Sequence, residues 1–346
     1  MHIFDYGFLT QSIPSELARA AALVSGLRAS NALRVAESPD AFEALREAAV
    51  IESVRGSNAI EGIVTTRARL EGILRGEVGP ESHGEREILG YRRALDEMYA
   101  PGFDADLTEE YICHLHGLLL GASSPEAGKY KRSDNWIQQR DADGRISVRF
   151  VPVAAKVTPD AMAQLVMAYR DARQNSAVDP LALIACVVLD FLCIHPFADG
   201  NGRVSRLLTT MLLEREGFDI GRYVSLEGKV DEYKTGYYDA LAAASVGWHD
   251  GEGDYIPFVT FMLQVVYACY KELDQRFVED SLRRVPKTEL VERVLMDAYV
   301  PMSKAEVCER LPEVSAKTVQ RVIARMVDEG RLEKIGTYRD ARYRRV

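Results

Sequence analysis

The chain has 346 residues, 47% of them hydrophobic and 27% charged, and a formal net charge of −9. This length predicts two or three folded units, and the acidic balance argues against nucleic-acid binding by the chain as a whole. The longest apolar run, residues 181–194, is interrupted by Asp190 and is too short to span a bilayer. The first residues lack the basic stretch and long apolar core of a secretory signal, so we expect no membrane contact. Five scattered cysteines, an odd number, favour reduced thiols and a cytoplasmic location.

Helical periodicity runs through most of the first 275 residues. The helices that it predicts cover residues 15–33, 39–62, 84–100, 108–122, 160–174, 181–194, 202–216, 232–245 and 255–277. Residues 136–153 differ, because Asp143 and Gly144 lie between short runs rich in Ile, Val and Phe, which is the pattern of a β-hairpin. We therefore predict a mainly α fold whose helical core carries one hairpin.

The sequence changes character after Pro286. Three short helices are expected, at residues 287–298, 303–311 and 315–332. A two-stranded wing around Gly336 follows them, so this region outlines a winged helix-turn-helix.

The last of these helices is basic along one side. Residues 315–346 hold nine Lys or Arg against four Asp or Glu, a local surplus of +5. The helix itself carries Lys317, Gln320, Arg321 and Arg325 near one face, as a helix that reads DNA would. Two interpretations stay open, because a winged helix can equally serve as a protein-docking or dimerisation module.

The segment HPFADGNGRVSR follows the apolar run directly and is rich in polar side chains. Pro196 ends the preceding helix, and Gly200 and Gly202 permit tight turns in which consecutive N–H groups bind an anion. The helix that begins there directs the positive end of its dipole toward the same place. Arg203 and Arg206 lie three residues apart on one face of it. These features predict a phosphate site.

Two titratable side chains complete the prediction. Asp199 is a hard oxygen ligand placed to hold Mg²⁺ against phosphates, and His195 titrates near neutrality, as suits a general base. Taken one at a time, such a histidine is usually structural, a GNG string is usually a turn, and arginines on a helix are usually solvated. Because all of them fall within twelve residues, we predict a nucleoside triphosphate site with a base beside it.

The string HPFADGNGRVSR also resembles, without departure, the Fic-domain family signature His-x-Phe-x-Asp/Glu-Gly-Asn-Gly-Arg-x-x-Arg. The resemblance implies a Fic-type helical core that transfers AMP from ATP, with Mg²⁺, to a Ser, Thr or Tyr hydroxyl of a target protein. It implies that His195 is the catalytic base, that Asp199 binds Mg²⁺ and that Phe197 packs inward. The nucleotide-binding residues that it implies are Gly200, Asn201, Gly202, Arg203, Arg206, Tyr237 and Tyr238.

The hairpin and one tyrosine-rich stretch also resemble parts of Fic proteins. The hairpin is similar to a flap that pins the target segment by strand pairing. Tyr237 and Tyr238 lie in a stretch similar to the one that closes over adenine, although aromatic core packing explains them equally well. The glycine before Arg203 is similar to AMP-transferring members of the family rather than to its kinase-like branch.

A second motif, SNAIEG, resembles the inhibitory motif Ser/Thr-x-x-x-Glu-Gly/Asn of many Fic proteins. Ser57 and Glu61 are four residues apart and share a helix face, and Gly62 is a residue type that ends helices. A capping serine and an exposed glutamate would explain the string without any function. The resemblance implies that Glu61 pairs with Arg206, blocks the γ-phosphate and holds the enzyme inactive. A related hypothesis is that Glu61 positions water for removing AMP from modified proteins.

These patterns predict three segments: a helical segment over residues 1–100 with the inhibitory helix at about 50–62, a Fic catalytic core over 101–275, and a winged helix over 286–346. We expect an autoinhibited protein adenylyltransferase that binds ATP and modifies a target protein and itself. The alternative is a DNA-binding transcriptional regulator whose Fic core is a sensor. A homodimer is expected from the resemblance alone.

Overall fold

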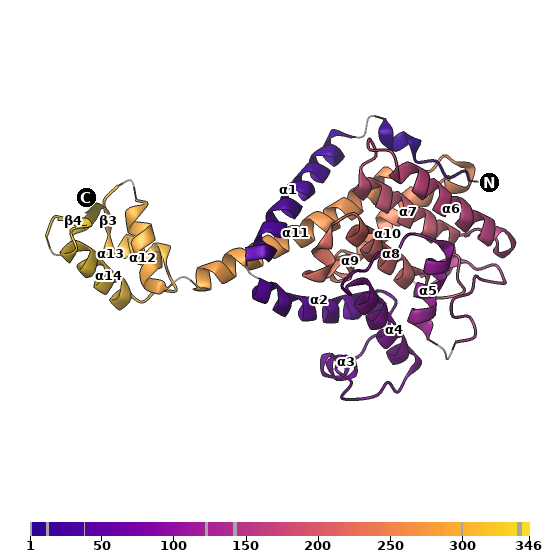
Figure 1. Cartoon of the computed structure of the whole chain (residues 1–346), viewed down its shortest axis with the longest axis horizontal. Helices are drawn as coiled ribbons and strands as arrows, with labels where there is room; N and C mark the ends of the chain where they lie inside the picture. Colours follow the sequence, from indigo (N-terminus) through magenta and orange to yellow (C-terminus); the bar gives the residue numbers. More distant parts are fainter. Residues whose placement is uncertain are drawn as a thin grey trace. The chain divides into compact units, whose positions relative to one another are not determined.

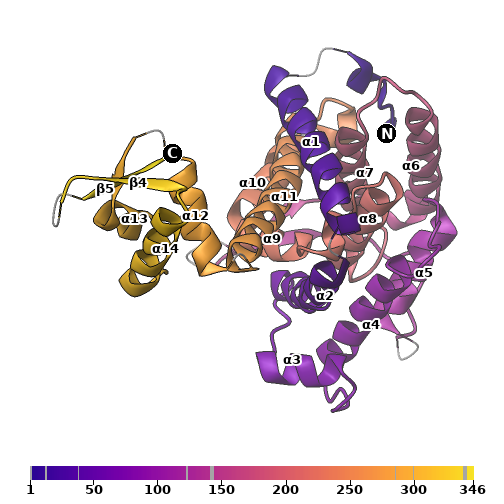
Figure 2. The same ribbon diagram turned by 60° about the vertical axis from the view of Figure 1, so that its left-hand side comes forward.

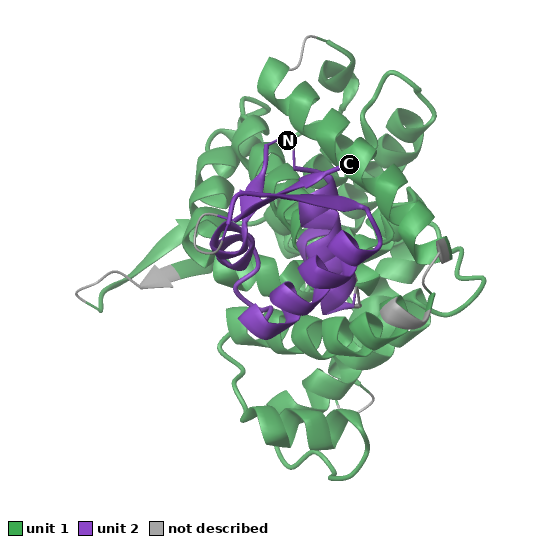
Figure 3. Ribbon diagram, turned by 90° about the vertical axis from the view of Figure 1, so that its left-hand side faces the viewer, with its two compact units in different colours: residues 1–273 green, residues 274–346 purple. Residues whose placement is uncertain are grey.

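The computed structural model describes residues 2–11, 14–37, 39–121, 124–140, 144–284, 286–298, 300–337 and 341–346. The chain divides into two compact units, residues 1–273 and 274–346, which Figure 3 distinguishes by colour. Both are built mainly from helices (Figures 1 and 2), so the predicted mainly α fold is confirmed. Residue 100, where we expected a segment boundary, lies inside the first unit.

The first unit is a set of helices joined by short turns and one hairpin. Its α-helices are α1 (Ser15–Glu37), α2 (Pro39–Ile60), α3 (Arg67–Leu74), α4 (His83–Met98), α5 (Glu109–Leu120), α6 (Thr158–Arg173), α7 (Pro180–Ile194), α8 (Asn201–Arg215), α9 (Leu226–Glu232), α10 (Lys234–Ser245) and α11 (Ile256–Arg284), which continues beyond the unit. Its strands and 3-10 turns are β1 (Ile137–Arg140), β2 (Ile146–Phe150), η1 (Gly7–Thr10), η2 (Ala155–Val157), η3 (Asp219–Arg222) and η4 (Trp248–Asp250). Within the described ranges, no helix combines the length and the apolar character needed to cross a membrane.

Helix α7 is the centre of the first unit. It packs against α6, α8 and α10 (Figures 1 and 2), and every residue from Leu181 to Ile194 is buried. A helix that is apolar on all sides is stable in a soluble unit when other elements surround it. Its start is fixed by Asp179, whose carboxylate accepts the N–H groups of Leu181 and Ala182 at 3.0 Å, and by Pro180 in the first turn. This packing holds the end of α7 in one place, and the polar HPFADGNGR segment begins there.

Asp190 is the one charged residue in this apolar helix. Its Oδ2 accepts the Tyr6 hydroxyl at 2.7 Å, and its Oδ1 accepts Trp248 Nε1 at 2.7 Å and the Tyr255 hydroxyl at 2.8 Å. Burial raises the pKa of Asp190 from 3.8 to about 6, against the opposing effect of these three donors. The carboxyl therefore joins the N-terminal segment, α7 and the chain before α11 in one network.

Replacing Asp190 with leucine is expected to lower the free energy of unfolding by about 3 kcal/mol or more, because three buried donors lose their acceptor. Asp190→Asn keeps one acceptor oxygen and should lose less. Because the folded pKa of Asp190 lies above its unfolded value, this carboxyl contributes most stability below about pH 4 and loses that contribution as the pH rises through about 6. Urea unfolding at several pH values measures both effects, and a difference between wild type and Asp190→Asn that is constant from pH 4 to pH 7 would contradict the pKa assignment.

The predicted hairpin is present as the antiparallel pair β1–β2. Its register shifts between Ile137 and Gln138, and such a bulge increases the local twist of the pair. Asp143, half of the expected turn, lies outside the described residues. Gly144 has a φ of +81°, which favours glycine.

The second unit contains a small helical core and an antiparallel sheet. Its elements are α12 (Lys287–Met296), β3 (Met302–Ser303), α13 (Lys304–Arg310), α14 (Ala316–Asp328), β4 (Leu332–Ile335) and β5 (Arg342–Arg345). The sheet order is β3–β5–β4. Val291, Val307 and Val319 are completely buried between the helices. The short strand β3 was not predicted, because two residues are too few for a periodic pattern.

Candidate functional site

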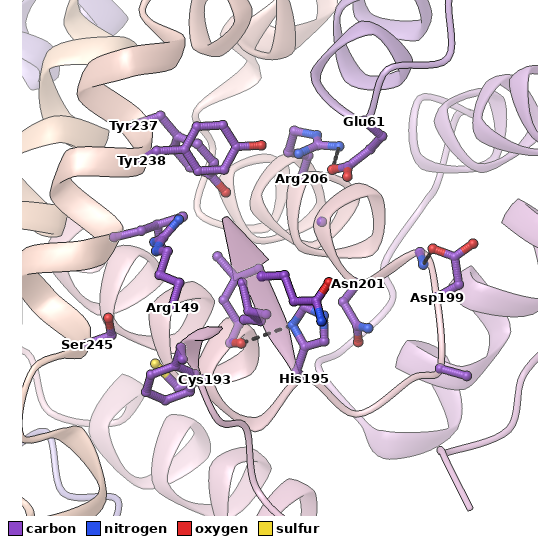
Figure 4. Close-up of a pocket in the computed structure, with 18 residues that line it drawn as sticks. Glu61, Arg149, Cys193, His195, Asp199, Asn201, Arg206, Tyr237, Tyr238 and Ser245 are labelled. Atoms are coloured by element: carbon purple, nitrogen blue, oxygen red, sulfur yellow. Dashed lines mark hydrogen bonds and ion pairs between the residues drawn. The ribbon is translucent and has the colours of Figure 1, made fainter. Parts of the chain in front are cut away.

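A cavity of about 530 Å³ opens at the C-terminal end of α7. Its wall comes from the end of α2, the hairpin, the turn between α7 and α8, and α10 (Figure 4). The lining residues are Glu61, Ile137, Gln138, Arg149, Phe150, Leu192, Cys193, His195, Ala198, Asp199, Gly200, Asn201, Gly202, Arg206, Tyr237, Tyr238, Leu241 and Ser245. The two sequence motifs, although distant along the chain, therefore meet at one cavity.

His195 follows the last residue of α7 and is the only non-glycine residue in the described ranges with a positive φ, 52°. Its N–H donates to the Phe191 carbonyl at 2.9 Å, which closes the helix. Its ring Nδ1 lies 3.2 Å from the Leu192 carbonyl oxygen, so Nδ1 carries the proton and Nε2 keeps a free lone pair (Figure 4). Burial, with a smaller contribution from the Lys131 ammonium, lowers the pKa of His195 to about 4. The imidazole is therefore neutral at pH 7 and can accept a proton.

A segment outside the motif holds this turn in place. Lys131 donates its backbone N–H to the Pro196 carbonyl at 2.8 Å and its Nζ to the Ile194 carbonyl at 3.2 Å. The same Nζ donates to Asn135 Oδ1 at 2.8 Å, and Asn135 Nδ2 donates to the Phe197 carbonyl at 3.0 Å. Burial lowers the pKa of Lys131 to about 8. No periodicity or motif marks these two residues in the sequence, so their role is visible only in the fold.

The turn between α7 and α8 is closed by the side chain of Asn201. Its Oδ1 accepts the Phe197 N–H at 2.9 Å, and its Nδ2 donates to the Phe197 carbonyl at 2.8 Å. Gly200 has a φ of +78° and directly precedes α8. The first N–H groups of a helix have no partner within the helix, and this helix start lines the cavity. The backbone therefore offers an anion site here.

The side chains of Phe197 and His116 pack together and support the turn between α7 and α8. Phe197 is fully buried, as predicted, and its ring stacks on His116 with 3.8 Å between the ring centres. His116 accepts the Gly128 N–H on Nδ1 at 3.1 Å and donates from Nε2 to the Asp199 carbonyl at 3.2 Å. Burial lowers the pKa of His116 to about 4, so this ring is neutral and its tautomer is fixed. The His116 ring thus holds the backbone of Asp199, whose side chain is 76% exposed and lines the cavity.

The two motif arginines have different surroundings. Arg206 is 6% exposed, and its Nη2 lies 2.7 Å from Glu61 Oε1 and 2.9 Å from the Ser57 carbonyl oxygen. Its Nε donates to Ser57 Oγ at 2.9 Å. Arg203 is instead buried in an ion pair with Glu87 at 2.8 Å, and its side chain does not line the cavity. The structure thus brings Arg206, but not the Arg203 guanidinium, to the predicted phosphate site.

Glu61 lies just beyond α2, which ends at Ile60 rather than at the expected Gly62. The N–H groups of Gly62 and Ile63 donate back to carbonyls of the last turn at 3.0 and 2.9 Å, and Gly62 has a φ of +78°. This is the hydrogen-bond pattern of a helix that ends at glycine. The turn directs the Glu61 carboxylate to Arg206 (Figure 4).

Two glycines allow this segment to approach its neighbours closely. A Cβ at Gly202 would collide with Glu61 Oε1, and a Cβ at Gly56 of α2 would lie 2.8 Å from the Gly228 backbone nitrogen of α9. A side chain at Gly56 would collide with backbone atoms that cannot give way, and one at Gly202 would displace the Glu61 carboxylate. The position of Glu61 is therefore set by the packing of α2 on α9 as well as by the ion pair.

Tyr237 and Tyr238 of α10 both line the cavity. Tyr237 is 4% exposed, and its ring centre lies 6.1 Å from that of Phe258 and 5.7 Å from that of Phe261. Tyr238 is less buried and lies beside Arg149. Tyr237 therefore packs in the core, one of the two interpretations drawn from the sequence, and it also lines the cavity.

Other residues of the cavity wall were not singled out from the sequence. They include Arg149 and Phe150 of β2, Leu192 and Cys193 of α7, and Leu241 and Ser245 of α10. Because side chains of a strand alternate between two faces, some hairpin residues had to point inward. Which ones do so depends on the position of the hairpin against α7 and α10, and the sequence pattern does not contain that information.

The cavity wall contains two carboxylates, those of Glu61 and Asp199. The residues that the structure describes include no group of three or more His, Cys, Asp or Glu side chains placed to hold a metal ion. Mg²⁺ usually binds one or two carboxylates and completes its shell with water and phosphate oxygens. One exposed carboxylate at Asp199, beside a backbone anion site, fits a metal ion that binds together with a nucleotide.

Comparison with known proteins identifies related sequences. The Fic/DOC family model matches residues 106–213. "Protein adenylyltransferase Fic" of Drosophila melanogaster is 28% identical over 234 residues, which are 65% of this chain and 42% of that protein. "Protein adenylyltransferase fic-1" of Caenorhabditis briggsae is 26% identical over 211 residues, 59% of this chain and 37% of that protein. The chain thus spans less than half the length of these curated relatives.

Solved structures share the fold. A Fic family protein from Desulfovibrio desulfuricans aligns over 97% of both chains with a TM-score of 0.64 and 22% identity. A Fic domain containing signaling protein from Bacteroides thetaiotaomicron aligns over 74% of this chain and 94% of its own, with a TM-score of 0.58 and 22% identity. The predicted Fic-type helical core is therefore confirmed. The chain thus contains a segment, residues 106–213, that matches the Fic/DOC family, within a fold shared with Fic proteins.

Proposed function

We propose that this chain is a protein adenylyltransferase, which transfers AMP from ATP to a hydroxyl of a target protein and of its own chain. One observation carries the proposal: the free Nε2 of His195 shares a cavity with the anion site at the start of α8 and with Arg206. Transfer of a phosphoryl group to a hydroxyl requires a base beside a phosphate site. The names of the relatives support the same reaction.

In this mechanism Nε2 of His195 takes the proton of the target hydroxyl while the hydroxyl oxygen attacks the α-phosphorus of ATP. The bond from that phosphorus to the bridging oxygen breaks, and pyrophosphate leaves. The backbone N–H groups of Asn201 and Gly202, with the dipole of α8, stabilise the charge on the phosphoryl oxygens, whereas the Gly200 N–H donates to Asp199 Oδ1 at 2.6 Å. Asp199 would hold Mg²⁺, and the bound ion would supply further positive charge beside the phosphates.

We propose that the same geometry inhibits the reaction. Glu61 accepts from the Nη2 group of Arg206 at 2.7 Å, and Ser57 accepts from its Nε. A γ-phosphate needs that guanidinium and would meet the Glu61 carboxylate in its place. ATP then binds with its α-phosphate out of line with the attacking hydroxyl, so transfer is slow.

The fate of the α-phosphate tests the proposed reaction. Purified Glu61→Gly protein is incubated with Mg²⁺ and with ATP labelled at either the α- or the γ-phosphate. The proposal expects protein-bound label from α-labelled ATP only. Label from γ-labelled ATP would show a kinase-like transfer. Label from neither, even with a cell lysate as a source of target proteins, would refute AMP transfer.

Replacing Lys131 with methionine in the Glu61→Gly protein is expected to lower kcat for AMP transfer about 10- to 100-fold, because Nζ no longer holds the turn that carries His195. The Lys131 ammonium lowers the pKa of His195, so its loss should raise that pKa. The Asp199 carboxylate, which also raises the pKa of His195, remains in place. The acid side of the kcat–pH profile should therefore move to higher pH. Lys131→Arg keeps the cation and should keep the profile in place. A lower kcat with an unmoved profile in Lys131→Met would assign the residue a purely structural role.

A second candidate function concerns the C-terminal unit, which we propose to be a winged helix that binds DNA phosphates. Lys317, Gln320 and Arg321 are exposed along α14. Arg325, which was expected on the same face, is paired with Glu292 of α12. A gel shift that weakens with added salt and persists without the catalytic histidine would support DNA binding. The absence of any shift at low salt would refute it in favour of protein docking.

A further inference from the structure

Arg149 is a cation in the cavity wall for which neither motif accounts. It lies on β2, and its Nε is enclosed by protein without a hydrogen-bond partner among the described residues. The two motif arginines are each paired with a carboxylate, Arg206 with Glu61 and Arg203 with Glu87. Arg149 has no carboxylate partner among the described residues, so the N–H groups that it presents to the cavity are available to a ligand.

The surroundings of Arg149 differ from the phosphate end of the cavity. Its guanidinium carbon lies 5.6 Å from the centre of the Tyr238 ring. Figure 4 shows Arg149 beside Tyr238, and in this view His195 lies between Arg149 and Asp199. Leu192 of α7 and Leu241 of α10 also line the cavity. An aromatic face, apolar side chains and a fork of N–H donors suit a flat ring that has acceptor atoms at its edge.

The proposed reaction determines which part of the nucleotide lies near Arg149. The α-phosphate must lie within reach of His195, and the remaining phosphates extend along the anion site toward Arg206. The nucleoside must then extend from His195 in a different direction from the phosphates. Asp199 and Gly200 occupy the phosphate side, whereas the aromatic and apolar wall around Arg149 is available to the nucleoside.

We propose that Arg149 binds the base of the substrate nucleotide by donating hydrogen bonds to acceptor atoms at the ring edge. This inference rests on the proposed function, because it takes ATP as the substrate. A guanidinium group only donates, and adenine offers the unprotonated ring nitrogens N1, N3 and N7 as acceptors. Arg149 is thus a specificity-determining residue that recognises the base, while Arg206 and the start of α8 bind the phosphates.

Nucleotide affinity tests the assignment directly. Isothermal titration calorimetry gives the Kd of ATP in a parent protein that carries Glu61→Gly and His195→Ala, which frees Arg206 and prevents turnover. Arg149→Met should bind ATP about tenfold more weakly or worse, and Arg149→Lys should lose less. Arg145→Met is the matched control, because it removes a charge from the same hairpin outside the cavity lining. The control should stay within about twofold of the parent, as most surface substitutions do.

Analogues of ATP identify the acceptor atom and separate the outcomes. The 1-, 3- and 7-deaza forms each lack one ring nitrogen. One of them should bind the parent about tenfold more weakly than ATP and yet match ATP in Arg149→Met. An unchanged Kd for ATP in Arg149→Met would overturn the role of Arg149 and leave the proposed function standing. The same would follow if each analogue lost as much affinity in Arg149→Met as in the parent. A parent that binds no ATP at all would overturn the proposed function together with it.

Discussion

Replacing Glu61 with glycine is expected to raise the rates of AMP transfer and self-modification by about 10- to 100-fold, equivalent to about 1.4–2.8 kcal/mol in the barrier. Arg206 is nearly buried and donates to Glu61 and Ser57, so it is not available to a γ-phosphate while Glu61 is in place. Glycine removes the competing carboxylate and also its bulk beside Gly202. The initial rate of label incorporation from α-labelled ATP measures the effect.

One further substitution separates the effect of the Glu61 charge from the effect of its size, and a second serves as a control. Glu61→Gln keeps the size of the side chain and removes its charge, so its rate should lie between those of wild type and Glu61→Gly. Glu52→Gln removes a carboxylate that pairs with Arg55 on the same helix, outside the cavity. It should leave the rate unchanged. Equal rates in wild type and Glu61→Gly would show that Glu61 does not inhibit the reaction.

Replacing His195 with alanine in the Glu61→Gly protein is expected to lower kcat by about 10²- to 10⁴-fold, the usual contribution of a general base. The Kd for ATP should change little, because the anion site is made from the backbone of the turn and the start of α8. Burial lowers the pKa of His195 to about 4, so the imidazole is already neutral across the physiological range. The rate should therefore be flat near neutral pH and fall as the pH decreases through the pKa of this ring.

A histidine outside the cavity provides the control for this substitution. His114 lies on α5, is 47% exposed and pairs with Glu97 at 2.9 Å. Its replacement by alanine should leave kcat within about twofold. If His195→Ala retained the rate of the Glu61→Gly protein, the proton would have to go to another group, and the proposed mechanism would be wrong.

The parts of the site that could be predicted from the sequence are those encoded in short contiguous strings. Gly200 and Gly202 have local conformational requirements, and His195 follows directly from the end of an apolar helix. Such features depend on neighbouring residues, so twelve residues suffice to indicate a phosphate site beside a base. The expected hairpin and the mainly α fold likewise follow from local periodicity.

Residues that act across the fold could not be found in this way. Lys131 supports the His195 turn from a segment with no regular pattern, and its contacts exist only because α7 ends there. Glu87 takes up the guanidinium of Arg203, so a side chain expected at the phosphates is buried elsewhere. Arg149 enters the cavity through the placement of the hairpin. Each of these depends on tertiary packing, which no local pattern records.

The close contact of Gly56 with the backbone of α9 would couple the proposed autoinhibition to local stability. Because α2 packs closely on α9, we expect the Glu61 carboxylate to move away from Arg206 most readily when the last turn of α2 unravels. Helix ends open at much lower free energy than the core, so mild warming or a low concentration of urea should activate the enzyme before it unfolds. A protein or peptide that captures the loosened end of α2 would have the same effect. The rate of AMP transfer would then depend on how often the C-terminal turn of α2 unravels.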